Sequence, residues 1–289
     1  MSENILANEP MIRLSAFLGV FLIMAALEAA SPRRRRQVSR LLRWSNNLAL
    51  VALDTAVLRI AFPILAVGAA MVAADQGWGV LSLLQLPEWI IVLLAVVLLD
   101  LAVYGQHVLF HHVPWFWRLH RMHHADLDFD VTTAVRFHPL EIMLSMLIKI
   151  GVVVLIGAPA VAVVIFEILL NATAMFNHAN LRLPASFDRF LRLVLVTPDM
   201  HRVHHSVRRE EANSNFGFNL SIWDRLFGTY RAQPKDGHAG MTIGIEQFRT
   251  PRDLRIDRLL VQPFNGPTYL SPEDHRNSPP NDTALEFKP

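Results

Sequence analysis

Long apolar stretches recur along the N-terminal part of the chain, separated by short polar connections. A helix that crosses a bilayer core needs about 20 apolar residues, and several stretches approach that length. The pattern predicts an all-α polytopic membrane bundle with about four to five membrane helices. The stretches are Met11–Ala30, Leu48–Ala74, Pro87–Val103, Leu140–Ile156 and Ala160–Met175.

The last two stretches are slightly short for independent spans, so a tight hairpin that turns at Gly157–Pro159 accounts for them better. In that hairpin Lys149 and Glu167 are equally far from Ala158 along the chain and lie at the same depth. Ionisable groups inside a membrane are costly unless they are paired. We therefore expect a contact between Lys149 and Glu167, with their charged atoms within about 6 Å of each other.

A basic cluster between the first two stretches predicts the orientation in the membrane. Cytosolic loops carry an excess of arginine and lysine, so this loop is expected in the cytosol. Counting spans from there brings every histidine-bearing helix end to the same cytosolic face. The cluster consists of Arg33, Arg34, Arg35, Arg36, Arg40 and Arg43.

The chain divides into three parts on these patterns. Residues 1–87 hold N-terminal membrane helices and the basic loop, and residues 88–232 hold membrane helices and a histidine-rich cytosolic cap. Residues 233–289 form a C-terminal cytosolic segment. Beyond about Pro263 this segment is rich in proline, asparagine, serine and aspartate, which predicts a flexible tail.

Composition narrows the class of protein further. The chain is 52% hydrophobic with a mean hydropathy of +0.30, which is too apolar for an ordinary soluble domain. Cysteine is absent, which excludes disulfides, thiolate metal ligands and iron–sulfur clusters. The net charge is only +2 and no basic stripe with interleaved aromatic residues occurs, which argues against nucleic-acid binding.

Eleven of the thirteen histidines lie between His107 and His205, and most follow helical spacings. Residues three and four positions apart share one face of a helix. Two HxxHH segments are therefore expected to present three imidazoles each to one point, and an HxxxH segment to present two. These histidines are His107, His111, His120, His123, His124, His201, His204 and His205, and His178 can add a ninth imidazole.

Clustered imidazoles indicate metal binding, because imidazole is a common ligand of iron, zinc, copper and nickel. A mononuclear zinc site uses three or four protein ligands. Eight or nine histidines that converge on one face of the membrane therefore indicate a di-metal site. Ligand type alone leaves iron, zinc, copper and manganese open.

The segments His107–His111, His120–His124 and His201–His205 resemble the histidine boxes of the fatty acid hydroxylase / sterol desaturase superfamily. Further similarity lies in the segments that follow the second and third boxes, Arg136–Glu141 and Asn215–Thr229. The resemblance extends over residues 100–231. It implies an integral membrane non-haem di-iron enzyme that uses O2 and two electrons to hydroxylate or desaturate a lipid.

The resemblance also implies the cofactors, ligands and partners. Two iron ions, with O2 as co-substrate, are implied at the eight box histidines. Some relatives have an HxxxH pair near the third box, where this chain has only His178, and we include His178 as a ninth ligand. No fused cytochrome-b5-like domain is visible, so an external donor, cytochrome b5-like or ferredoxin-like, is implied. We expect a multi-pass protein of the bacterial inner membrane, or of the endoplasmic reticulum membrane in a eukaryote.

The remaining polar residues divide into bystanders and supporting groups. His138 is either a ligand or a structural residue, and His112 points about 100° away from His111 on a helix. His238 and His275 lie in polar segments and are expected to be bystanders. Carboxylates and amides commonly orient ligating imidazoles. The candidates for that role are Asp100, Asn180, Asn219 and Asp224.

Three alternatives to a hydroxylase remain open from the sequence. A desaturase on the same scaffold has the same histidine pattern. A metal transporter would place its ligands near the bilayer midplane. A zinc hydrolase of the HExxH type needs a glutamate between its histidines, and neither HxxHH segment contains one.

Overall fold

The computed structural model describes residues 2–269 of the 289-residue chain, and its named elements are all helices. Five helices are long and apolar enough to cross a membrane, the second of them together with the short helices that follow it. The prediction of an all-α polytopic membrane bundle is thus confirmed. The five helices are α2 (Glu9–Ala30), α3 (Arg40–Ala61), α5 (Glu88–His112), α7 (Pro139–Ile156) and α8 (Ala160–Asn177).

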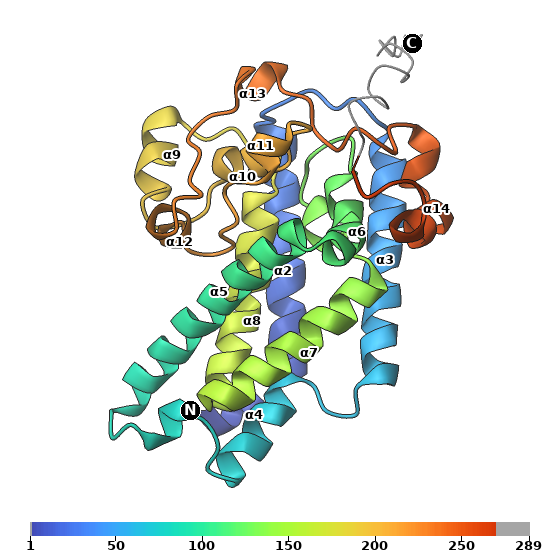
Figure 1. Ribbon diagram of the computed structural model, residues 1–289. Coiled ribbons are helices and arrows are strands. Elements are labelled where there is room, and N and C mark those ends of the chain that lie inside the picture. The colour runs from blue at the N-terminus through green and yellow to red at the C-terminus, as the bar shows by residue number, and fades with distance from the viewer. Residues whose placement is uncertain (1, 270–289) are drawn as a thin grey trace.

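The shorter helices gather mainly at one end of this bundle and form a cap (Figure 1). The loop between α2 and α3 reaches the same end, so the basic cluster and the cap lie together. The cap contains α6 (Pro114–His124), η2 (Thr133–Val135), α9 (Ala185–Leu191), α10 (Pro198–His204), α11 (Arg209–Ala212), α12 (Ile222–Leu226), α13 (Gly237–Gly240), η3 (Pro251–Leu254), α14 (Ile256–Val261) and η4 (Gln262–Phe264).

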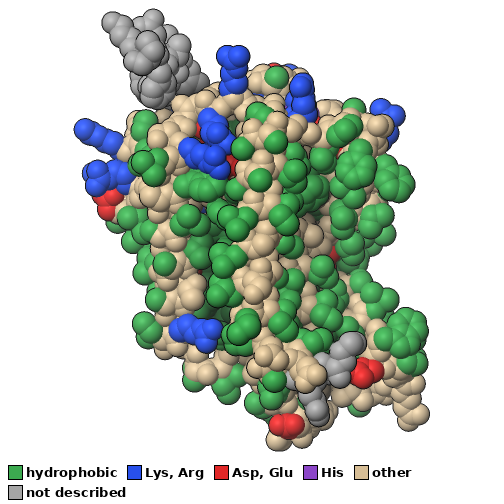
Figure 2. Space-filling view, turned by 180° about the vertical axis from the view of Figure 1, so that it is seen from behind, with side chains coloured by type: hydrophobic (Ala, Val, Ile, Leu, Met, Phe, Trp, Pro, Cys, Tyr) green, Lys and Arg blue, Asp and Glu red, His purple; other side chains and the backbone are tan. Residues whose placement is uncertain are grey.

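The outer surface of the bundle is apolar. Large side chains such as Leu22, Ile60 and Leu155 are 65%, 86% and 68% exposed, respectively. Figure 2 shows a broad hydrophobic zone over the spans, with most lysine and arginine side chains at the cap end. Monomeric soluble proteins do not expose apolar surface on this scale. The chain is therefore a multi-pass membrane protein.

The second apolar stretch is divided, although the sequence pattern suggested one continuous segment. Helix α3 ends at Ala61, and a separate ten-residue helix, α4 (Ala66–Asp75), follows. The cause is Pro63, which lacks a backbone N–H and disfavours helical backbone at Phe62, whose φ and ψ are −119° and 109°. Helix α4 lies at the end opposite the cap (Figure 1) and leads through η1 (Val80–Leu83) into α5.

The turn between α7 and α8 falls where the sequence predicts it. Gly157 ends α7 in the left-handed conformation, with φ of 67°. A side chain there would also stand 2.6 Å from the carbonyl oxygen of Trp78, so glycine is required twice over. The two helices diverge from this turn toward the cap (Figure 1), and α4 and α5 pack against both of them. The predicted tight hairpin is therefore an open one.

The expected charge pair inside the bundle is confirmed. Lys149 Nζ lies 2.7 Å from Glu167 Oε1, and the Glu167 side chain is only 4% exposed. A third member was not predicted: Arg13 Nη2 on α2 lies 2.9 Å from the other oxygen of Glu167. One carboxylate thus pairs with two cations and connects α2, α7 and α8.

The C-terminal segment packs against the cap as far as the description extends. Arg118 Nε donates to the carbonyl of Pro263 at 2.6 Å, and Arg121 donates to the carbonyls of Gln262 and Pro267 at 2.7 and 2.6 Å. Tyr269 stacks on Trp117, with ring centroids 6.3 Å apart. The predicted tail from residue 270 onward, including His275, lies outside the described residues.

We predict that Glu167→Gln destabilises the bundle by about 3 kcal/mol, because it leaves Lys149 and Arg13 with one uncompensated charge between spans. Thermal or denaturant unfolding in detergent measures the effect. Glu9→Gln is the matched control, since Glu9 also pairs with Arg13 but is more exposed than Glu167. Equal stability of the two variants would contradict a structural role for the Glu167 pairing.

Candidate metal centre

Three short helical segments carry the histidine boxes into the centre of the cap. Helix α5 continues to His112, which places His107 and His111 one turn apart on its buried face. Helix α6 begins at Pro114, a favourable residue at the first helical position, and α10 begins at Pro198 with the Thr197 side chain accepting from Met200 N. The HxxHH boxes lie at the ends of these two helices.

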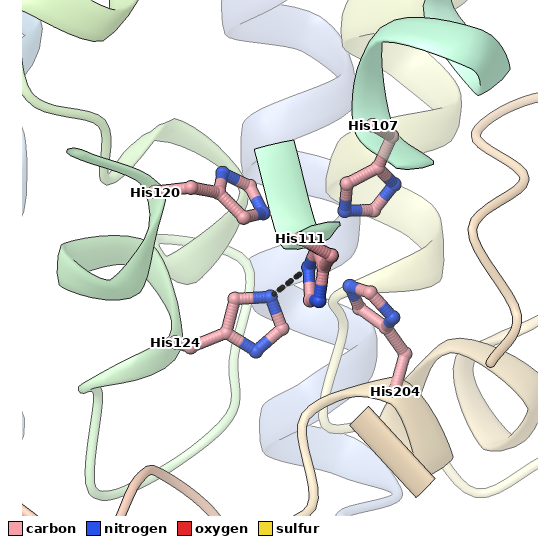
Figure 3. Close-up of side chains that lie close together, drawn as sticks. All are labelled: His107, His111, His120, His124 and His204. Carbon is pink, nitrogen blue, oxygen red and sulfur yellow. Dashed lines mark hydrogen bonds between the residues drawn. The ribbon is translucent and has the colours of Figure 1, made fainter. Parts of the chain in front are cut away.

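The nine predicted histidines form two groups, and within each group the potential donor atoms all lie within 4.8 Å of one another. We call them the α5 group and the α8 group. In Figure 3 the rings of the α5 group converge from α5, α6 and α10. The α5 group is His107, His111, His120, His124 and His204, and the α8 group is His123, His178, His201 and His205.

Each HxxHH box is divided between the two groups, which corrects the expectation that a box presents three imidazoles to one point. On α6, His120 and His124 join the α5 group whereas His123 joins the α8 group. On α10, His201 joins the α8 group with His205, and His204 joins the α5 group. The i, i+4 pair stays together because those positions share a helix face, and the third ring points to the neighbouring group.

The inward nitrogens of these rings form a site that suits metal ions. His111 Nε2 lies 3.1 Å from His124 Nε2, and His178 Nε2 lies 3.1 Å from both His123 Nε2 and His201 Nε2. Buried polar atoms are normally hydrogen-bonded. Nevertheless the Nε2 atoms of His107, His120 and His204 are buried and have no hydrogen-bond partner among the described residues. Lone pairs that converge in this way fit a cation at each group.

The outer nitrogens are held by acceptors that fix ring orientation. The Nδ1 atoms of His107, His204 and His178 lie 2.7, 2.8 and 2.8 Å from the carbonyl oxygens of Phe216, Ser214 and Ala174. An N–H donated to these carbonyls leaves the Nε2 lone pair pointing inward. Backbone geometry therefore selects the metal-binding tautomer.

Two side chains also hold imidazoles, and neither was among the predicted supporting groups. Glu141 Oε1 at the start of α7 lies 2.6 Å from His120 Nδ1. Asn213 Oδ1 lies 3.3 Å from His111 Nδ1. The sequence signal for Glu141 was its place in the segment Arg136–Glu141, but only the fold brings it to His120.

None of the four predicted supporting residues forms a hydrogen bond with any of the nine imidazoles. The prediction that these residues orient the rings directly was therefore wrong. Asp224 instead accepts from the backbone N–H groups of Phe216 and Gly217 at 2.7 and 2.9 Å, which shapes the loop whose carbonyl holds His107. Asp100 accepts from Asn219 N at 3.3 Å in the same loop. Asn180 pairs with the backbone of Arg34, and the Asn219 side chain accepts from Thr173.

The other histidines lie outside both groups. His138 caps α7 by accepting from Leu140 N, and its Nε2 faces the carbonyl of Leu260, so it is a structural residue. His112 is exposed and bonds to its own helix, as expected. His238 lies in α13 rather than in a polar loop; it is buried, and its Nε2 lies 3.6 Å from Asp199 Oδ2.

Burial keeps the imidazoles of the α5 and α8 groups neutral. Loss of hydration lowers the pKa of His120 to about 3 and that of His178 to about 3. Burial, followed by neighbouring imidazoles, holds the pKa values of His123, His124 and His205 well below their ordinary value of 6.5. Neutral imidazole is the form that binds metal.

A buried ionic network fixes the segment that follows α6. Arg43 of the basic cluster is fully buried, and it bonds to both oxygens of Asp126 at 2.7 Å and also to Asp130. Burial raises the pKa of Asp126, but Arg43 and Arg136 outweigh it and bring the value down to about 2. The chain that follows His124 is therefore fixed to α3.

Residues 92–229 match the family described as fatty acid hydroxylase, and this range includes every histidine of both groups. The match covers just under half of the chain, 138 of its 289 residues. The resemblance to the fatty acid hydroxylase / sterol desaturase superfamily is thereby confirmed. No solved structure shows a significant match to the chain.

Several curated relatives of this chain are enzymes named for lipid substrates. An ornithine lipid hydroxylase of Rhizobium tropici is 30% identical over 55% of this chain and 47% of its own length. Human alkylglycerol monooxygenase is 31% identical over 52% of this chain and 32% of its own length. Rat cholesterol 25-hydroxylase is 24% identical over 50% of this chain and 47% of its own length. The chain thus matches less than half the length of each of these relatives.

We predict that Glu141→Gln lowers the metal affinity of the histidine centre by about tenfold, because it replaces the carboxyl group that holds the outer nitrogen of His120. Competition with a chelator during metal titration measures the affinity. Glu210→Gln, at an exposed position on α11, is the control and should bind as the parent does. Unchanged affinity in Glu141→Gln would show that the carboxylate does not support the site.

The metal-free protein should lose stability as the pH falls below 6.5. The unfolded chain takes up protons on its imidazoles near pH 6.5, whereas folded His120 and His178 do so only near pH 3, so acid favours unfolding throughout that interval. For His120 alone the loss at about pH 5 is about 2 kcal/mol. Melting temperatures of chelator-treated protein between about pH 7.5 and 5 test this, and a flat profile would contradict neutral burial.

Proposed function

We propose that this protein is an integral membrane, O2-dependent di-iron lipid hydroxylase that acts on a C–H bond of an acyl chain, sterol or related lipid. Residues 88–232 are its catalytic part, residues 1–87 supply further membrane helices, and residues 233–289 form the C-terminal segment. Each group of histidines would hold one iron ion. The nine ligands are His107, His111, His120, His123, His124, His178, His201, His204 and His205.

The observation that carries the proposal is the pair of buried imidazole groups directly above a bundle of apolar spans. Five and four neutral imidazoles exceed what one metal needs, and their donor atoms already converge. All nine imidazoles lie at the cap end of the bundle. A transporter would need its ligands near the bilayer midplane, so this position favours an enzyme over a transporter. The named functions of the relatives agree with a lipid C–H bond as the target.

The two iron ions would supply the O2 activation, and this chain's residues supply position and protection. The outer-nitrogen bonds to Phe216 and Ser214 hold the rings in place before substrate arrives. Phe216 is fully buried, and the rings of His107 and His111 lie 5.5 and 5.1 Å from its ring. Such apolar walls exclude water, which keeps oxidising equivalents for the substrate.

The overall reaction inserts one oxygen atom into a C–H bond, and the other leaves as water. It consumes two electrons and two protons, which we assign to an external donor of the cytochrome b5 or ferredoxin type. We place the cap in the cytosol because the basic loop shares its face. Desaturation by the same scaffold would consume the same O2 and electrons but leave no oxygen in the lipid.

We predict that the protein, incubated with a lipid extract, reductant, donor and isotopically labelled O2, yields lipids that carry one labelled oxygen atom each, detected by mass spectrometry. His204→Ala should abolish the product, since it removes a ring from the α5 group. His112→Ala, which leaves both groups intact, should retain it. A product that lacks two hydrogens and contains no label would instead identify a desaturase.

A further inference from the structure

Helix α12 lies at the membrane edge, although it belongs to the cap. Trp223 Nε1 donates to Asp100 Oδ2 at 2.8 Å, and the ring of Phe227 stacks on Tyr104 with centroids 5.3 Å apart. Both partners belong to the spanning helix α5. Tyr104 precedes the end of α5 at His112 by about 12 Å of helix, and Asp100 by about 18 Å. Helix α12 therefore lies beside α5 at the level where the helix enters the bilayer.

The surface of α9 and α12 is apolar where it faces outward. Phe190 is 70% exposed and Leu226 is 67% exposed, and five neighbours are at least half exposed. The two helices stand on the outer edge of the cap, clear of the bundle (Figure 1), and hydrophobic side chains gather on that edge at the upper right of Figure 2. The five neighbours are Phe187, Leu193, Val194, Ile222 and Phe227.

An arginine-rich cavity of about 720 Å³ opens behind this apolar surface. It lies between the end of α2, helix α9 and residues 230–238. Apart from the buried neutral His238, its titratable lining comprises four arginines, two aspartates and Tyr230, which gives a surplus of two positive charges. The charged residues are Arg33, Arg182, Asp188, Arg189, Arg192 and Asp199.

The surplus belongs to two particular side chains. Arg33 lies 3.0 Å from Asp199, and Arg192 is paired with Asp188. The guanidinium groups of Arg182 and Arg189 have no acceptor among the described residues, and both side chains are exposed. Guanidinium groups bind phosphate through two parallel N–H donors, so two unpaired guanidinium groups that line one cavity suit a phosphate group.

We propose that this cavity binds the phosphate of an anionic phospholipid, whose acyl chains pack against the apolar surface of α9 and α12. Charge alone would suit any phosphate. The adjoining apolar surface at bilayer level favours the phosphate of a lipid, because the acyl chains can contact that surface while the headgroup occupies the cavity. Anionic lipids attract arginines near a membrane surface, which would hold the cap against the membrane.

The site is separate from the metal centre. His201 and Asp199 lie on the same helix, α10, but Asp199 lines the cavity and His201 belongs to the α8 group. The proposal therefore does not depend on hydroxylase activity, and binding can be measured on protein of any metal content.

Calorimetric titration of the full chain in detergent tests the proposal, with soluble dihexanoyl phosphatidylglycerol, dihexanoyl phosphatidylcholine and inorganic phosphate as probes. We expect phosphatidylglycerol to bind most tightly. The double variant Arg182→Gln/Arg189→Gln should weaken it about 10- to 30-fold. The control Arg252→Gln/Arg258→Gln makes the same charge change at exposed arginines near α14, across the cap, and should leave binding unchanged.

Three results would overturn the proposal. Equal affinity for the two lipids would show that the cavity does not recognise the negative charge of the lipid. If inorganic phosphate bound as tightly as phosphatidylglycerol, the cavity would be a site for free anions. Unchanged binding in the double variant would place the lipid elsewhere. The single variant Arg189→Gln repeats the test with an expected loss of about fivefold, if the double variant fails to fold.

Discussion

Nine neutral imidazoles meet at the centre of the cap with their inward nitrogens only a few ångströms apart, and the surrounding structure is arranged to keep them there. Such a cluster resists protonation, because burial penalises each charge and each charged ring would repel the next. The cluster is also costly to bury without a cation, because the Nε2 atoms of His107, His120 and His204 have no hydrogen-bond partner in the described part of the chain. Metal binding relieves this cost, so the site and the stability of the cap are coupled.

The supports of this cluster come from every level of the fold. Backbone carbonyls fix the outer nitrogens, and Asp224 shapes the loop that supplies one of them. Glu141 reaches His120 from the first turn of a membrane helix, so the bundle contacts the metal centre directly. Arg43 binds the segment after α6 to α3 through Asp126. Arg43 belongs to the basic cluster from which we infer the orientation in the membrane, so one member of that cluster also fixes the cap to α3.

The sequence was most informative where periodicity and charge act locally. Helical spacing predicted which histidines converge, and the arginine cluster predicted that the histidine-bearing helix ends share one face. The equal distances of Lys149 and Glu167 from the turn predicted their contact. The division of each HxxHH box between two groups was not predicted, because it depends on how α5, α6 and α10 cross. Arg13 and Glu141 were missed for a similar reason, since their partners lie far away in sequence.

The central claim is that two groups of histidines hold two metal ions, and elemental analysis of the purified, detergent-solubilised chain tests it most directly. The account predicts about two iron ions per chain, because nine ligands exceed the three or four of a single site. His204→Ala and His201→Ala, one in each group, should each reduce the metal content, whereas His112→Ala should leave it unchanged. A single metal ion per chain, or a content insensitive to the His204 and His201 variants, would contradict the account.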